Sequence, residues 1–272
     1  MESLQSTLFI LLGSINFIIA PSYSGQVYGP LEPETPVRKL FGKKFYQKLT
    51  KKSILRSGLL NKNRRIMKIR KNEIAIAVIA LITILISIYF YPQMPERMAS
   101  HWSASGNVDG YLPKFLGLFL IPFVLTIVLT LFVAIPRIDP LKTNIEKFRT
   151  YYDTFTVLLA LFLFYIYILT LLWNLGTYYN MSQMLAPAFG VLIYYLGIML
   201  ENSRRNWFVG IRTPWTMSSE GVWDKTNKLG GKLMKTAGVV AFFGVVFPNF
   251  GFWLILVPTI AAALYSTIYS YT

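Results

Sequence analysis

Six long apolar stretches govern what this chain can fold into. About 20 consecutive apolar residues cross the hydrocarbon core of a bilayer as one helix. The composition agrees, because 54% of the residues are apolar and 14% are charged, whereas a typical soluble domain has about 25% charged residues. The sequence therefore predicts an all-α integral membrane protein, a bundle of six transmembrane helices. The expected spans are Ile74–Tyr91, Phe115–Ile135, Phe155–Trp173, Met184–Leu200, about Leu233–Phe247 and about Phe250–Tyr269.

The positive charges of the connecting loops alternate along the chain. Loops 136–154 and 201–232 carry four and six Lys or Arg residues, whereas loop 92–114 carries two and loop 174–183 carries none. Lys and Arg accumulate in the cytoplasmic loops of membrane proteins. We therefore expect a multi-pass protein of the cell membrane in which both ends of the six-span unit are cytoplasmic.

Residues 1–66 form a basic N-terminal extension that contains a further apolar segment, Thr7–Ala20. This segment is short for a span, and Glu2 without any Lys or Arg precedes it, which is not the pattern of a secretory signal. Two interpretations stay open: the segment is an extra anchor, or the native protein begins at Met67. We favour the second, so that the extension would not be native.

The remaining chain divides into three regions at its loops. Residues 67–135 hold the first two spans and an external loop, residues 136–183 a cytoplasmic loop and the third span, and residues 184–272 the last three spans with a long cytoplasmic loop.

Several kinds of chemistry are excluded or disfavoured by residue type. The chain has no cysteine and one histidine, so disulfides, thiolate metal sites and a two-histidine zinc site are excluded. The spans hold no Asp, Glu, Lys, Arg or His except Lys235 at the edge of the fifth, and ion-coupled transporters need such charged groups inside the membrane. We expect neither a metal nor a cofactor, and no enzymatic activity.

The external loop between the first two spans carries a group of polar and aromatic residues. Its segment Gly106–Gly110 is rich in turn-forming Gly, Asn and Asp. Two interpretations stay open: a folded cap whose Trp102 and Tyr111 lie at the membrane interface, or a contact site for an external ligand. The candidate contact residues are His101, Trp102, Asn107, Asp109 and Lys114.

The cytoplasmic loop 201–232 is the second polar region. One interpretation is a short amphipathic helix with Val222, Trp223 and Leu229 in the membrane interface and with Lys225 and Lys228 facing the phosphates. Lipid contact would explain the charges of this loop. It explains less well the string Gly-Ile-Arg-Thr-Pro-Trp, in which several conformationally special residues are consecutive.

Residues 206–231 closely resemble the signature of the SdpI-type immunity-protein family, which reads roughly N-x-x-(I/V)-G-I-R-T-P-W-T-L-x-S-E-x-V-W-x-x-T-H. The external stretch 95–114 is similar to the domain of unknown function that commonly precedes this signature. One position departs from the pattern, because this chain has Asn227 where the family usually has His. The signature positions are Asn206, Gly210, Arg212, Thr213, Pro214, Trp215, Glu220, Trp223 and Asn227.

The resemblance implies a membrane protein that protects its cell against a secreted antimicrobial peptide and that signals to a cytoplasmic repressor. The expected partners are the lipid bilayer, a peptide outside and a regulatory protein inside, without direct binding of nucleic acid. A small-molecule transporter or permease is the alternative. An enzyme that uses His101 with Asp109, or Arg212 with Glu220, as acid–base partners is a third class.

Overall fold

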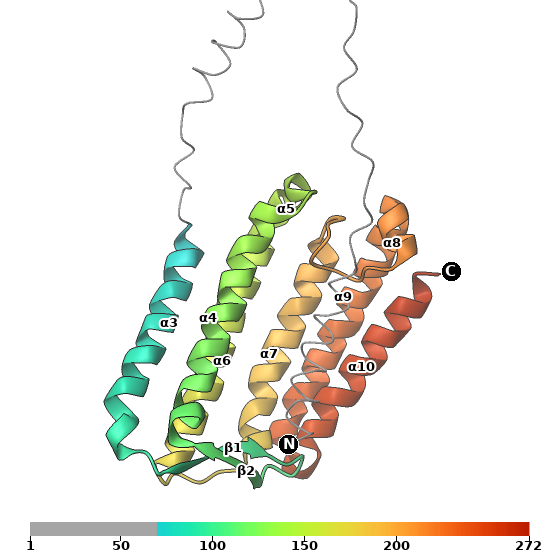
Figure 1. The fold of residues 1–272 in the computed structure, drawn as a ribbon. Helices are drawn as coiled ribbons and strands as arrows, with labels where there is room; N and C mark the ends of the chain where they lie inside the picture. The colour runs from blue at the N-terminus through green and yellow to red at the C-terminus, as the bar shows by residue number, and fades with distance from the viewer. Residues whose placement is uncertain (1–69, 272) are drawn as a thin grey trace, which may run out of the picture. The chain divides into compact units, whose positions relative to one another are not determined.

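A computed structural model describes residues 70–271 as a bundle of long helices with a small β-hairpin at one end (Figure 1). The N-terminal extension, its apolar segment 7–20 and the alternative start at Met67 lie outside the described residues. Five of the described helical segments are long and apolar enough to cross a membrane, which confirms a helical membrane protein. These segments are α3 (Lys71–Phe90) with the following 3-10 turn to Gln93, α4 (Lys114–Ile138), α6 (Arg149–Asn174), α7 (Met181–Asn202) and α10 (Gly251–Tyr269) with the 3-10 turn Pro248–Phe250 before it.

The expected fifth span has different bounds from those predicted. The helix in this region is α9 (Glu220–Phe242), which begins in the polar loop and is followed by a 3-10 turn at Phe243–Val245. Its first half carries several charged residues, so α9 is not among the five apolar candidates. Propensity and local capping start the helix at Glu220, far before the apolar stretch, because Ser219 caps it by accepting a hydrogen bond from the Val222 N–H.

Glycines bring α7 and α9 into backbone contact. A Cβ atom on Gly190 would lie 2.9 Å from the carbonyl oxygen of Gly238, and one on Gly197 would lie 2.5 Å from that of Gly231. Such small residues let membrane helices approach closely. Gly190 and Gly197 therefore serve helix packing.

The other half of the bundle is held by apolar packing and by a few buried polar contacts. Ile76 of α3, Leu125 of α4 and Ala160 of α6 belong to one buried cluster. Near the C-terminal end of α3 in the same half, the Ser87 hydroxyl lies 2.8 Å from the Tyr167 hydroxyl. Polar contacts of this kind join helices in a bilayer because hydrocarbon offers no other partner.

Loop 92–114 contains the one departure from an all-α fold within residues 70–271. Strands β1 (Arg97–Trp102) and β2 (Val108–Pro113) pair in an antiparallel hairpin with register shifts around His101. Gly106 permits the turn because its φ is 83°. We call this end of the bundle the hairpin end, and the opposite end, which carries α5 (Lys142–Lys147) and α8 (Pro214–Ser218), the signature end (Figure 1).

Candidate functional site

The signature segment, residues 203–219, connects α7 to α9 and folds into a compact loop at the signature end (Figure 1). Several polar residues within it are buried rather than solvated: Ser203, Asn206, Thr213 and Thr216. Buried polar groups are retained when they are hydrogen-bonded. The contacts of these residues therefore define the shape of the loop.

Asn206 organises the first turn of the signature segment. Its Oδ1 accepts hydrogen bonds from the backbone N–H groups of Phe208 and Val209 at 2.9 and 2.7 Å. Its Nδ2 donates to the carbonyl oxygens of Arg204 and Val209 at 2.8 and 2.7 Å. One carboxamide thus satisfies backbone groups that no helix or strand would satisfy here. The structure assigns Asn206 a structural task.

Side chains from the α4–α5 region hold the same turn from outside. The Oδ2 of Asp139, which is 2% exposed as a residue, accepts a hydrogen bond from the Trp207 N–H at 2.9 Å. The Nδ2 of Asn144 donates to the carbonyl oxygen of Arg205 at 2.8 Å. These contacts join two loops that are far apart in sequence.

Gly210, Trp223 and Asn227 form the centre of the site. Gly210 has a φ of 124°, and a Cβ atom there would lie 2.7 Å from the Trp223 ring. The Trp223 Nε1 donates to the Ser203 carbonyl oxygen at 3.3 Å. The Asn227 Oδ1 accepts from the Ile211 N–H at 2.8 Å, and its Nδ2 donates to the Trp223 carbonyl oxygen at 3.1 Å.

The expected placement of Trp223 in the membrane interface is wrong. Trp223 is 0% exposed and packs under the signature segment as part of α9. Asn227, which replaces the usual histidine of the family pattern, is equally buried and keeps hydrogen bonds to the loop and to its own helix.

Thr213 and Pro214 start α8 and attach it to α10. Thr213 and Thr216 cap the helix reciprocally, because each side chain accepts a hydrogen bond from the other residue's backbone N–H. The hydroxyl of Ser270, which caps the C-terminus of α10, donates to the Thr213 hydroxyl at 2.9 Å. Next to this contact, the Trp215 ring meets the Tyr271 ring edge to face at 5.0 Å. The signature segment is therefore fixed to the last turn of α10.

Arg212 and Glu220 do not form a pair. The Arg212 guanidinium donates to the Trp207 carbonyl oxygen. Burial lowers the pKa of Arg212, and the negative charge of Asp139 opposes that shift. The Glu220 carboxylate is largely exposed and lies 3.6 Å from a guanidinium nitrogen of Arg205. The acid–base pair of Arg212 with Glu220 is therefore not assembled.

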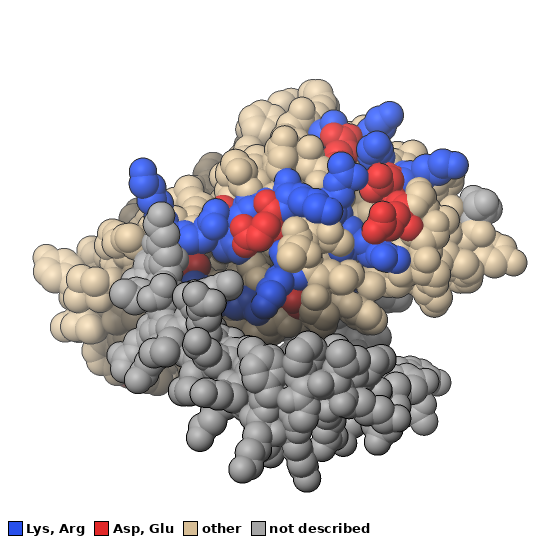
Figure 2. All heavy atoms as spheres, turned by 90° about the horizontal axis from the view of Figure 1, so that it is seen from above, with Lys and Arg blue, Asp and Glu red and all other residues tan. Residues whose placement is uncertain are grey.

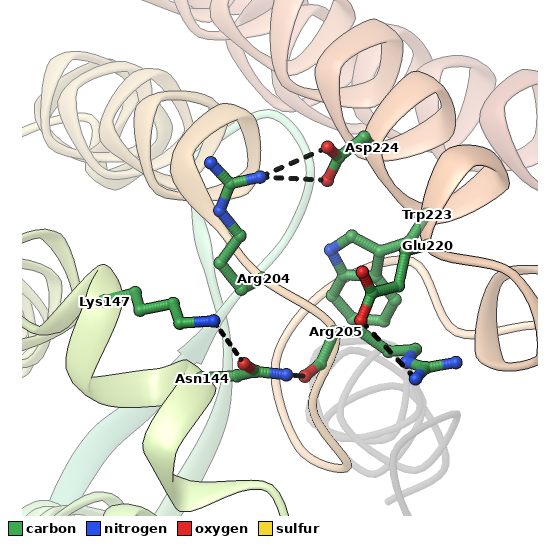
Figure 3. Close-up of a pocket in the computed structure, with 7 residues that line it drawn as sticks. All are labelled: Asn144, Lys147, Arg204, Arg205, Glu220, Trp223 and Asp224. Atoms are coloured by element: carbon green, nitrogen blue, oxygen red, sulfur yellow. Dashed lines mark hydrogen bonds and ion pairs between the residues drawn. The ribbon is translucent and has the colours of Figure 1, made fainter.

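A hollow of about 210 Å³ opens beside the signature segment (Figure 3). Arg204 reaches Asp224 across it at 3.2 Å, and Lys147 donates to the Asn144 Oδ1 at 3.0 Å. Both cations and carboxylates line the hollow, and basic and acidic side chains gather together on this end of the bundle (Figure 2). The hollow is lined by Asn144, Lys147, Arg204, Arg205, Glu220, Trp223 and Asp224.

At the hairpin end, the structure brings His101 and Asp109 together. The His101 Nδ1 and the Asp109 Oδ1 are hydrogen-bonded between the two strands. Gly110 makes room for it, since a Cβ atom there would lie 2.9 Å from the His101 Cβ. Asn107 lies in the exposed turn, where its Nδ2 donates to the Ser105 hydroxyl at 3.2 Å.

Trp102 and Lys114 make separate contacts at the two ends of the strands. The Trp102 ring meets the Trp173 ring edge to face at 6.1 Å. The Lys114 Nζ donates to the Glu96 carboxylate at 2.8 Å. His101 and Asp109 therefore form a pair, and the other candidate contact residues are spread along the hairpin rather than gathered in one cluster.

The hairpin is attached to the α6–α7 connection. The Asn174 Oδ1 accepts from the Ala99 N–H at 2.7 Å, and its Nδ2 donates to the Ala99 carbonyl oxygen at 3.0 Å. The Asn180 Nδ2 donates to the Ser105 carbonyl oxygen at 2.7 Å. The Ser182 hydroxyl donates to the Ala104 carbonyl oxygen at 3.1 Å. These bonds hold the hairpin as a fixed cap.

Sequence reasoning missed several residues that build these two ends. Asp139 and Asn174 act across long sequence separations, which no local pattern reveals. Thr216 had a signal, because the spacing Thr213-x-x-Thr216 around Pro214 matches a capping box. The described residues contain no group of three or more His, Cys, Asp or Glu that could hold a metal ion.

The comparisons with known proteins agree with these two regions. Residues 202–270 match the SdpI/YfhL protein family, and residues 78–126 match the domain of unknown function DUF1648. The chain is 26% identical over 203 residues to "Immunity protein SdpI" of Bacillus subtilis (strain 168), which covers 74% of this chain and 95% of that protein. No solved structure gives a significant match. The predicted resemblance to the SdpI-type immunity-protein family is thus confirmed, and the region that matches the family contains the signature segment together with α9 and α10.

Proposed function

We propose that this chain is a non-enzymatic membrane immunity protein that protects the cell against a secreted antimicrobial peptide. The similarity to Immunity protein SdpI over 95% of that protein carries the proposal. The five apolar helices support it as well, since an amphipathic peptide that attacks a cell acts at the membrane.

In this proposal the hairpin end lies outside and contacts the peptide. The hairpin is fixed to the bundle by Asn174 and Asn180, so it presents a preformed surface. On this surface Asp109 keeps 46% of its side chain exposed, and the carboxylate suits a cationic peptide. The contact residues would be His101, Trp102, Asn107, Asp109 and Lys114.

The signature end would lie in the cytoplasm and contact a regulatory protein. The distribution of Lys and Arg among the loops supports this orientation. The signature segment offers exposed Trp207 and Trp215 next to the mixed charges of the hollow, and aromatic residues and arginines are enriched in protein interfaces. The orientation also requires α9 to cross the membrane as a sixth helix, for which its glycine contact along α7 is the support.

Expression in a peptide-sensitive bacterial host tests the immunity function. Cells that express the chain should survive peptide concentrations that kill the empty-vector control. Asp109→Asn should lower protection, whereas Glu96→Gln, an exposed carboxylate on the same end, serves as the matched control. If no secreted peptide from the producer or its neighbours gives a survival difference, the proposal fails.

The orientation has a direct test because the chain has no cysteine. Single cysteines at the exposed positions Thr177, at the hairpin end, and Thr143, at the signature end, are treated with a membrane-impermeant maleimide in intact cells. Labelling of Thr177→Cys alone supports the orientation, and Asn249→Cys should then label as well if α9 crosses. Labelling of Thr143→Cys alone would show that the orientation is the opposite of the one proposed.

A further inference from the structure

An apolar groove of about 490 Å³ runs along the contact between α7 and α9. Its floor is made by Gly190 and Gly238, where the two backbones meet. Its walls are side chains of which about half the surface remains exposed, including Val191, Val239 and Phe242. Since the walls are apolar and α7 is a membrane-crossing candidate, the groove opens toward hydrocarbon.

A row of lysines continues the α9 wall of this groove toward the signature end. Lys225, Lys228, Lys232 and Lys235 are spaced by three, four and three residues, so they share one face of the helix over about 15 Å. Val239 and Phe242 follow at the same spacing. One helix face therefore changes from apolar to cationic along its length.

The charges around this row leave a surplus of positive charge. Lys235 is paired with Glu201 of α7 at 2.8 Å, and Asp224 is paired with Arg204 at 3.2 Å. Within the described residues, Lys225, Lys228 and Lys232 are exposed and take part in no salt bridge or side-chain hydrogen bond. These three cations are available for a ligand.

The depth of the lysines fits the headgroup region of the bilayer. Side chains on a helix lean toward its N-terminus, so the α9 lysines lean toward the signature end. The Lys235 Nζ reaches Glu201 near the end of α7, which is the end of a membrane-crossing segment. A lysine whose stem lies along apolar surface and whose ammonium group reaches the interface is in the usual snorkelling arrangement.

The geometry points to a binding site for one anionic phospholipid on the α7–α9 face. An acyl chain lies in the groove over Gly190 and Gly238, and the phosphate of the headgroup lies among Lys225, Lys228 and Lys232. Cationic pockets between membrane helices bind anionic headgroups in this way. The charge of the row selects an anionic lipid over a zwitterionic one. The inference does not depend on the proposed immunity function.

Native mass spectrometry of the full chain in a mild detergent tests the site. The probe is an equimolar mixture of phosphatidylglycerol and phosphatidylcholine with the same acyl chains. The wild type should retain one phosphatidylglycerol in preference to phosphatidylcholine. Each lysine near a membrane surface is worth about a fivefold change in affinity, so Lys225→Gln with Lys228→Gln and Lys232→Gln should abolish the preference.

Two matched controls separate a built site from general effects. Lys71→Gln with Lys142→Gln and Lys147→Gln removes the same charge from exposed positions elsewhere and should keep the preference. Val239→Trp should fill the groove and lower retention of both lipids, whereas Val257→Trp, at a similarly exposed site on α10, should leave it unchanged.

Three results would overturn the inference. The first is equal retention of the two lipids by the wild type. The second is an equal loss of preference in both lysine triples, which would mean bulk attraction. The third is the same lipid retention in wild type and Val239→Trp, as expected if a second copy or another segment of this chain fills the groove.

Discussion

Gly190 of α7 and Gly238 of α9 face each other so closely that a Cβ atom on either would lie within 3 Å of the other's carbonyl oxygen, at 2.9 Å from Gly190 and 2.7 Å from Gly238. The contact is reciprocal, and the pair Gly197 and Gly231 repeats it along the helices at 2.5 and 2.6 Å. Neither backbone can move away without opening the floor of the groove.

Gly238→Ala should therefore destabilise the protein. The added methyl group would lie 2.6 Å from the Tyr194 nitrogen, and forcing extra atoms into a packed contact costs about 1–3 kcal/mol. Thermal unfolding in detergent should show a lower midpoint. Gly221→Ala, whose Cβ atom would meet only the Ser219 hydroxyl at 3.8 Å, is the control and should change stability by less than about 1 kcal/mol. Equal midpoints for both variants would contradict a tight glycine contact between α7 and α9.

Asn227 gives a second prediction, at the position that departs from the family pattern. Asn227→Leu should loosen the signature segment, since it leaves the Ile211 N–H without its acceptor, and an unsatisfied buried donor costs about 1–3 kcal/mol. Asn227→His should retain the loop, because a neutral imidazole offers one acceptor and one donor. Hydrogen–deuterium exchange of residues 206–219 is the measurement. Faster exchange in the histidine variant than in the leucine variant would contradict this role of the hydrogen bonds of Asn227.

Thr213→Val removes the cap of α8 and the acceptor of the Ser270 hydroxyl while keeping the shape of the side chain. Loss of an N-cap costs about 1 kcal/mol, so residues 213–219 should exchange amide hydrogens faster than in the wild type. Thr236→Val is the matched control, because the Thr236 hydroxyl is exposed and only bonds the Lys232 carbonyl oxygen of its own helix. Unchanged exchange in Thr213→Val would show that Ser270 does not fix the loop.

Asn174→Leu should release the hairpin from the α6–α7 connection. The substitution removes both hydrogen bonds to Ala99, so the amides of residues 97–113 should exchange faster, and peptide protection should fall if the hairpin is the contact surface. Asn107→Ala, in the exposed turn, should leave the exchange of the strands near the wild-type rate. A wild-type exchange pattern in Asn174→Leu would mean that other contacts hold the hairpin.

Hydrophobic length predicted most of the helices, because a bilayer constrains every span in the same way. It misplaced α9, since its N-terminal half is polar and continues into the loop through local capping by Ser219. The apolar stretch alone therefore marked the wrong first residue. The hairpin was anticipated as a compact loop by its Gly and Asn residues, but its attachment to the bundle uses Asn174 and Asn180 from distant segments.

The signature could be recognised in the sequence, but the structural role of its residues could not be predicted from it. Asn206, Gly210, Trp223 and Asn227 were identified as signature positions without a role, and the structure uses them to build the loop. Their burial depends on how α9 packs under the segment, which a linear pattern cannot show. The pairing of His101 with Asp109 is confirmed as a contact, while its role as a ligand site stays a prediction.

The attachment of the hairpin to α7 restricts how a signal could pass through this protein. Met181 and Ser182, in the first turn of α7, bond the hairpin turn through Gly106 and Ala104, and farther along α7 meets α9 without intervening side chains. A peptide that displaced the hairpin without breaking these bonds would therefore shift α7, and α9 with it. Spin labels placed on these two helices should then keep a constant separation while both move relative to α3.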